Sequence, residues 1–324
     1  MTQLDSPPDA VEAKDDRNPD RAGPARREIP AERPRAPLPT GLISGKRTAW
    51  RRALSRATAS VNRILDVVPP VRWLHDKVCA SVEFTDVPVQ LRRGGDGLHG
   101  LRIAFVSDIH AGSFLGERDL CRIFERINAA EPDIVCLGGD LINTRDRELL
   151  LFRRALSLLT PPLGVYAVPG NHDHFWGADI GLWEAFLQEH GVEVLTNRGM
   201  RLQRGGASFW IAGVDDLTEG EPDLRRAIEA ANDNEPVVLL AHHPDFFFEA
   251  AAVQVDLTLS GHTHGGQIRF GRWAPLNHSK FDWLQGSYAV EESQLYVSRG
   301  VGVTFLPIRI GAPAEIPIVE LRVR

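Results

Sequence analysis

Cysteine is scarce in this sequence of 324 residues, which has only Cys79, Cys121 and Cys136. Three cysteines without a CxxC pair give no disulfide framework, and a reducing compartment suits them best. Cys121 and Cys136 stand in apolar runs with the periodicity of a helix and of a strand. We therefore expect these two to be small core residues and not metal ligands.

Long apolar runs are missing as well. No stretch reaches the roughly 20 apolar residues of a membrane-spanning helix, and the N-terminal region has no apolar core typical of a signal peptide. Residues 1–45 are rich in Pro, Asp, Arg and Ala and lack apolar periodicity, so we expect a disordered tail. Together these absences predict a cytoplasmic protein.

Most of the chain has fewer basic than acidic side chains, and the formal net charge of the whole chain is -6. Residues 78–324 carry about 22 basic and 33 acidic side chains, which argues against nucleic-acid binding, because that needs a basic face. Residues 46–77 differ, with about eight basic and two acidic side chains. The chain therefore divides into an acidic body and one short basic segment.

The basic segment, residues 46–77, has the pattern of an amphipathic helix that ends at Pro69-Pro70. Its apolar face consists of Trp50, Leu54, Ala57, Val61, Ile64 and Val68. Residues 46–70 could lie on an anionic membrane as a peripheral contact, which would place the protein at the inner membrane face. Alternatively, the apolar face packs on the acidic body and the arginines remain in solvent. The sequence leaves both alternatives open.

Residues 78–324 alternate between strand-like and helix-like apolar patterns, which is typical of an α/β domain. Five apolar runs of strand length each end in residues that bind metals or transfer protons. They occupy residues 101–110, 136–140, 167–173, 239–243 and 257–264. After residue 265 the pattern changes to short strands and turns, and we expect an antiparallel addition at one end of the domain. We interpret residues 78–324 as one catalytic domain.

The polar residues at the strand ends suit a metal centre. Side chains two apart on a strand point the same way, so Asp108 and His110 offer an oxygen and a nitrogen from one edge. A mixed carboxylate, imidazole and amide set suits Mn, Fe or Zn better than a dedicated Ca or Mg site. The candidates outnumber the ligands of one ion, so we expect two divalent ions about 3.5–4 Å apart. They are Asp108, His110, Asp140, Asn171, His172, His242, His262 and His264.

Five short motifs carry these residues in a fixed order. They are DIH at 108–110, GD at 139–140, GNHD at 170–173, AHHP at 241–244 and GHTH at 261–264. Each motif alone is a weak signal, but five in order are specific. Together they resemble the calcineurin-like metallophosphoesterase family. The resemblance implies a four-layer α-β-β-α sandwich of two mixed sheets.

The resemblance also implies a role for each candidate residue. Asp108, His110 and His264 would hold one ion, Asn171, His242 and His262 would hold the other, and Asp140 would bridge both. A water activated by the two ions would attack the phosphorus, so no Ser or Cys nucleophile is needed.

Two further residues of the GNHD motif receive catalytic roles from the resemblance. His172 would lie near the scissile phosphate, where it donates a proton to the leaving oxygen or stabilises charge. Asp173 would orient the His172 ring, as carboxylates often do. In the AHHP motif His242 is the expected ligand, whereas His243 points to the opposite strand face and packs or caps.

Details of the sequence narrow the resemblance. The GDxVDRG run of protein Ser/Thr phosphatases is absent, because residues 139–145 read GDLINTR. Residues 261–268, 296–302 and 306–309 instead resemble the YkuE/YaeI-type bacterial phosphodiesterases, which are linked to lipid or envelope phosphodiesters. The implied function is hydrolysis of a phosphodiester or pyrophosphate bond in a lipid- or envelope-linked substrate. Arg299 and Arg309 could grip a phosphate or form structural ion pairs.

Two alternatives to that function remain. The enzyme could be a phosphomonoesterase or a cyclic-nucleotide phosphodiesterase that acts on a soluble substrate. A non-catalytic scaffold of the same fold is disfavoured, because such a protein would be expected to lose ligands and none is lost here. The sequence does not indicate an oligomeric state.

The basic segment can be tested directly. Deletion of residues 46–70 should lower the fraction of protein that co-sediments with anionic vesicles, because it removes the apolar and basic residues that would bind the surface. Equal partitioning of the full and the shortened chain would favour packing on the acidic body.

Overall fold

The computed structural model describes residues 81–324 apart from 113, 175–178, 272, 276–277, 305 and 324, together with residues 27–28, 61, 65, 67–71 and 73. The expected disordered tail lies outside the described residues, except for a short strand at Arg27–Glu28 (β1). Most of the basic segment also lies outside them. No helix in the described part of the chain is both long and apolar enough to span a membrane.

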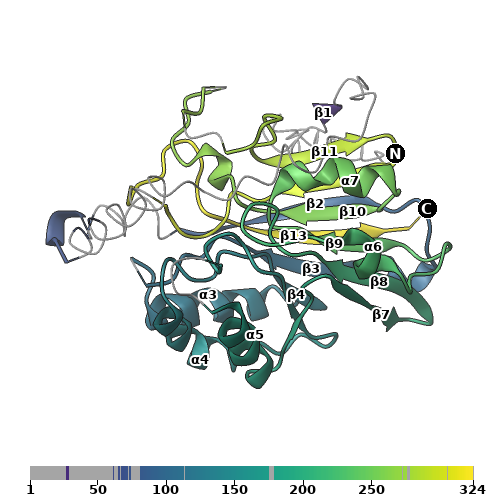
Figure 1. Cartoon of the computed structure of the whole chain (residues 1–324), viewed down its shortest axis with the longest axis horizontal. Coiled ribbons are helices and arrows are strands. Elements are labelled where there is room, and N and C mark those ends of the chain that lie inside the picture. Colours follow the sequence, from purple (N-terminus) through teal and green to yellow (C-terminus); the bar gives the residue numbers. More distant parts are fainter. Residues whose placement is uncertain are drawn as a thin grey trace, which may run out of the picture.

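A six-stranded mixed sheet forms one half of the centre, in the order β2-β13-β3-β4-β5-β6 (Figure 1). Its strands are Glu83–Gln90 (β2), Leu101–Val106 (β3), Ile134–Leu137 (β4), Val165–Ala167 (β5), Val192–Val194 (β6) and Glu315–Arg322 (β13). Strands β3 to β6 run parallel to one another. Strand β13 pairs parallel with β2 and antiparallel with β3.

A seven-stranded mixed sheet forms the other half, in the order β1-β11-β12-β10-β9-β8-β7. Besides β1, its strands are Arg198–Arg204 (β7), Ala207–Gly213 (β8), Val237–Leu240 (β9), Leu257–Ser260 (β10), Gly286–Val290 (β11) and Ser293–Val297 (β12). Strands β8, β9, β10 and β12 are parallel neighbours. The pairs β7–β8 and β11–β12 are antiparallel.

Helices cover the outer face of each sheet. The α-helices are Glu117–Ala129 (α3), Arg153–Leu156 (α4), Ile180–Glu189 (α5), Leu224–Ile228 (α6) and Phe247–Ala252 (α7), and the 3-10 helices are Asp96–Leu98 (η3), Asp146–Phe152 (η4), Pro244–Phe246 (η5) and His264–Gly266 (η6). Helices α3, α4 and α5 lie together on one side in Figure 1 and share an apolar cluster with the six-stranded sheet. Helices α6 and α7 share another cluster with the seven-stranded sheet.

A third apolar cluster fills the space between the two sheets. Phe105 of β3 lies in it together with Ile211 of β8 and Leu240 of β9, and all three are fully buried. Because side chains alternate along a strand, β3 directs Phe105 between the sheets and Ala104 toward the helices. The order of layers is therefore helix, sheet, sheet, helix, which confirms the four-layer sandwich.

The central cluster makes a stability prediction. Phe105→Ala should lower the free energy of unfolding by about 3–5 kcal/mol, because it leaves a cavity between the sheets. Leu150→Ala is the control, since this side chain is 52% exposed, and it should change the value by less than about 0.5 kcal/mol. Urea denaturation of both variants measures the difference, and equal midpoints would contradict the assigned core.

Candidate metal centre

The carboxyl ends of five strands carry the candidate residues to one place. Asp108 follows β3, Asp140 follows β4 and Asn171 follows β5, so one sheet supplies the carboxylates and the amide. His242 follows β9 and His262 follows β10, so the other sheet supplies imidazoles. Since neighbouring strands in each set run parallel, their carboxyl ends meet at one edge of the sandwich.

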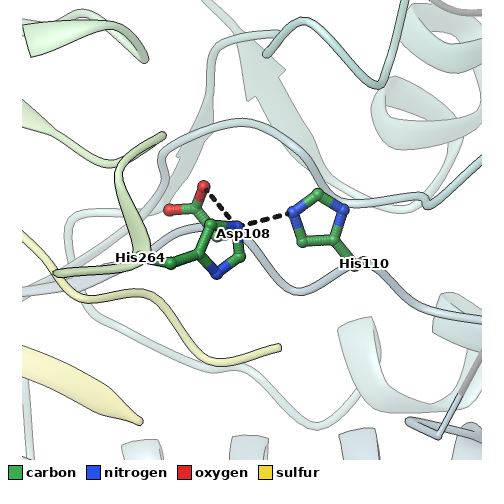
Figure 2. A group of neighbouring side chains, drawn as sticks. All are labelled: Asp108, His110 and His264. Carbon is green, nitrogen blue, oxygen red and sulfur yellow. Dashed lines mark hydrogen bonds and ion pairs between the residues drawn. The ribbon is translucent and has the colours of Figure 1, made fainter. Parts of the chain in front are cut away.

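The first group of possible ligands consists of Asp108, His110 and His264, shown in Figure 2. Their ligand atoms all lie within 4.8 Å of one another. Nε2 of His264 lies 3.0 Å from Nε2 of His110 and 3.5 Å from Oδ1 of Asp108. All three side chains are buried, so a cation among them would be shielded from water.

Two more groups adjoin the first, again with ligand atoms within 4.8 Å of one another. His110, Asp140 and His172 form one, which shares His110 with the first group, and Asp140, His242 and His262 form the other. Oδ2 of Asp140 lies 3.3 Å from Nε2 of His242 and 3.6 Å from Nε2 of His110. Asp140 therefore lies between the residues predicted to hold the two ions.

Unpartnered atoms at this place test whether a cation fits. Oδ1 of Asn171 is buried and has no hydrogen-bond partner, and the buried Nε2 of His242 faces only carboxylate oxygens, at 3.3 Å from Asp140. Leaving buried polar atoms unpaired costs about 1–3 kcal/mol each, and a bound cation would remove that cost. Nδ1 of His242 lies 2.8 Å from the carbonyl oxygen of Gly138, which leaves Nε2 as the ligand atom. The residues present therefore fit a divalent-metal site.

The backbone is unusual at five of the candidate ligands. Asp108, His110, Asp140, His262 and His264 have positive φ values of 54°, 47°, 52°, 70° and 52°. This left-handed conformation costs about 1–3 kcal/mol for a residue other than glycine, and it persists only where the surroundings enforce it. Such strain is typical of a functional site.

Two glycines allow the loops to approach the carboxylates. A Cβ atom on Gly261 would lie 2.3 Å from Oδ2 of Asp108, and one on Gly170 would lie 2.4 Å from Oδ1 of Asp140. Both distances are shorter than any tolerable contact. These positions of the GHTH and GNHD motifs therefore need glycine for close packing around the carboxylates.

Burial and mutual charge shift the protonation of the cluster. Burial raises the pKa of Asp108 to about 6. Burial also acts to raise the pKa of Asp140, but His242 and His172 outweigh it and hold this pKa well below its usual range. Burial lowers the pKa of His110 and of His264 well below 6.5. These two imidazoles are therefore neutral near pH 7, and the neutral form is the one that binds metals.

Comparison with known proteins agrees with this geometry. Residues 101–266 match the sequence profile described as calcineurin-like phosphoesterase. The chain belongs to this family. Membership assigns it to a class of phosphoric ester hydrolases whose members bind divalent metals.

Three relatives of the chain illustrate the similarity. A Bos taurus transmembrane protein with a metallophosphoesterase domain is 34% identical over 296 residues, which cover 83% of this chain and 65% of the relative. The Bacillus subtilis metallophosphoesterase YkuE is 30% identical over 246 residues, which cover 74% of this chain and 86% of YkuE. A Helicobacter pylori metallophosphoesterase is 34% identical over 229 residues, which cover 68% of this chain and 60% of the relative. The chain thus spans less than two thirds of two of these relatives.

His172 and Asp173, the two predicted catalytic residues, have different surroundings. Nδ1 of His172 lies 2.7 Å from the carbonyl oxygen of Asn143, and its backbone N–H donates to Oδ1 of Asp140 at 2.7 Å. The Asp173 carboxylate accepts hydrogen bonds from the backbone N–H groups of Leu141, Ile142 and Gly170. The carbonyl of Asn143 is therefore the group that faces this ring nitrogen of His172, and Asp173 joins the two ligand loops.

Two arginines that could have gripped a phosphate have structural contacts. Arg309 is buried and donates to the carbonyl oxygens of Gly302, Ala312, Arg299 and Gly300. Its Nη2 also lies 3.2 Å from Nδ1 of His264. Arg299 forms ion pairs with Glu83 and Glu315. Both arginines therefore support the loops around His264.

Two other histidines lie against His262. His243 accepts a hydrogen bond from the backbone N–H of Asp245 and caps η5, and its ring centroid lies 4.1 Å from that of His262. The His278 ring lies 5.8 Å from the His262 ring. His278 belongs to none of the five motifs. Only the tertiary fold brings it to the centre, so the sequence carries no signal for it.

Proposed function

We propose that this chain is a metal-dependent hydrolase of a phosphodiester or pyrophosphate bond. The observation that carries the proposal is the convergence of imidazoles from both sheets on the Asp140 carboxylate, with the buried, unpartnered Oδ1 of Asn171 on the next loop. Such a mixed set, shared around one carboxylate, suits a pair of divalent ions. Family membership supports the same class of reaction.

The residues divide naturally between two ions. Asp108, His110 and His264 would hold one ion, Asn171, His242 and His262 would hold the other, and Asp140 would contact both. Mn, Fe or Zn suits this donor set. Bound ions would lower the pKa of a water molecule and neutralise charge that develops on phosphoryl oxygens.

His172 is the residue proposed to act on the leaving group. With its Nδ1–H donated to the carbonyl of Asn143, proton transfer would fall to Nε2, which carries a proton only in the charged ring. The ring packs edge-on against His110 with centroids 4.5 Å apart, so it lies next to the first group of ligands. Asp173 would act indirectly, by fixing the loops that carry Asp140 and His172.

Exposed apolar side chains near the centre support a lipid- or envelope-linked substrate. The rings of Phe270 and Trp273 stack with centroids 6.0 Å apart, although these side chains are 57% and 62% exposed. This turn is connected to the residue 304–310 loop by the bridge Ile268–Ile310, and Arg309 of that loop contacts His264. Exposed aromatic side chains beside a site are typical of surfaces that bind lipids or other partners.

The described residues of the basic segment also support a lipid- or envelope-linked substrate. Val67 and Trp73 are exposed, while Leu65 and Val71 pack against Phe114 and Val303. The segment therefore contacts the body and also presents apolar side chains to solvent. We infer that the protein makes peripheral contact with the cytoplasmic face of an anionic membrane. The alternative is a soluble substrate, either a phosphomonoester or a cyclic nucleotide. The bovine relative's name, a transmembrane protein, is consistent with membrane contact.

Substitution of Asp140 tests the phosphoesterase activity. Asp140→Asn should slow the hydrolysis of bis-p-nitrophenyl phosphate in the presence of Mn at least about a hundredfold, because the neutral amide cannot balance two cations. Asp86→Asn, at an exposed position on β2, is the matched control and should keep the wild-type rate. Elemental analysis of both variants reports the metal content. Equal rates for the two variants would favour a non-catalytic scaffold.

The exposed aromatic pair tests the class of substrate. Phe270→Ser together with Trp273→Ser should lower the hydrolysis of a glycerophospholipid in vesicles about tenfold and leave that of a soluble bis-aryl diester unchanged, because it removes apolar contact area. Val253→Ser is the control, since this side chain is 51% exposed at the end of α7. If both substrates respond equally, the lipid-linked substrate is wrong and the soluble alternative is favoured.

A further inference from the structure

A short segment at residues 278–280 lies beside the group formed by Asp140, His242 and His262, and hydrogen bonds anchor it. The hydroxyl of Ser279 donates to Oδ1 of Asp245 at 2.6 Å, and the backbone N–H of Lys280 donates to Oδ2 at 3.0 Å. Ser279 and Asp245 are both buried. Asp245 follows His242 by three residues, so the loop that supplies a candidate ligand also fixes this segment.

The turn around Ser279 is rigid as well. Its Oγ accepts hydrogen bonds from the backbone N–H groups of Phe281 and Trp283, both at 3.2 Å. Trp283 is buried against Phe247 of α7. A side chain on this segment is therefore held in place before any ligand binds, which lowers the entropy lost on binding.

His278 is the residue that this segment presents to the centre. Its ring meets the His262 ring edge-on, with centroids 5.8 Å apart and an angle of 72° between the planes. His278 thus lies beside His262, yet it is exposed to solvent.

His172 and His278, which are both outside the proposed ligand set, take similar positions at different groups. His172 packs edge-on against His110, and His278 packs edge-on against His262. A ring needed only for packing would normally be buried, whereas the exposed imidazole of His278 can donate a hydrogen bond to a molecule that arrives from solvent. The anion that the proposed metal pair would attract is a phosphoester.

We propose that His278 is a substrate-binding residue whose imidazole donates a hydrogen bond to a phosphoryl oxygen of the phosphoester. Asp245 and Ser279 are positioning residues that hold it beside His262. This inference rests on the proposed function, because the proposed metal pair is what would bring a phosphoryl group next to His278.

The test uses the full chain loaded with Mn and two readouts. Calorimetry measures the binding of inorganic phosphate, and steady-state kinetics measure KM and kcat for bis-p-nitrophenyl phosphate. His278→Ala should weaken phosphate binding and raise KM about tenfold with kcat changed less than about threefold, because a hydrogen bond to an anion is lost. His278→Gln keeps an N–H donor and should restore most of the affinity.

The controls separate the possible failures. His99→Ala, which removes an exposed imidazole that contacts the Val323 carbonyl, should change neither readout, and all variants should retain the metal content of the wild type. Unchanged KM and phosphate affinity in His278→Ala would overturn the proposal, as would an equal loss in His278→Gln. A wild-type protein that binds phosphate without hydrolysing the diester would refute the proposed function, while the binding data would still decide the role of His278.

Discussion

The structure depends on the balance of charge around two buried carboxylates, Asp108 and Asp140. A buried carboxylate is costly unless it accepts hydrogen bonds or meets positive charge. Asp108 accepts the backbone N–H of His262, so a carboxylate from one sheet is held by a loop of the other sheet. Asp140 accepts the backbone N–H of His172 from a neighbouring loop. The same carboxylates that would bind cations therefore also hold the edges of the two sheets together.

This arrangement requires strained loops, and buried polar residues outside the ligand set restrain them. Asp173 accepts three backbone N–H groups from the loops after β4 and β5. Arg309 donates to four backbone carbonyls near His264. Glu148 accepts the backbone N–H groups of residues 143–145. Each ligand loop in these cases is fixed by a charged residue that is not itself a ligand, so positive φ values at the ligands can persist.

The sequence predicted local features better than tertiary ones. The apolar runs predicted at the start of 136–140 and 257–264 fall on strands β4 and β10, because continuous apolar runs mark buried strands. Of the strands expected after residue 265, β11 and β12 do pair antiparallel. Strand β13 instead enters the six-stranded sheet between β2 and β3, a non-local pairing that periodicity does not encode. The motifs predicted which side chains the fold brings together. The position of His278 could not be predicted in this way, because it depends on the tertiary contact between Ser279 and Asp245. The role that the resemblance implied for Asp173, to orient the His172 ring, stays a prediction; its carboxylate accepts backbone N–H groups of Leu141, Ile142 and Gly170.

Strand β13 lies between β2 and β3, although it follows every candidate ligand in the chain. During synthesis on the ribosome, all the ligand loops emerge while β2 and β3 still lack their common neighbour. The open edges of these strands are then available to other unfinished chains, which is a known route to aggregation. The pairing of Glu83 with Glu315 also closes a very long loop, a slow step in folding. A strand that contributes no candidate ligand is therefore needed to complete the sheet that carries Asp108 and Asp140.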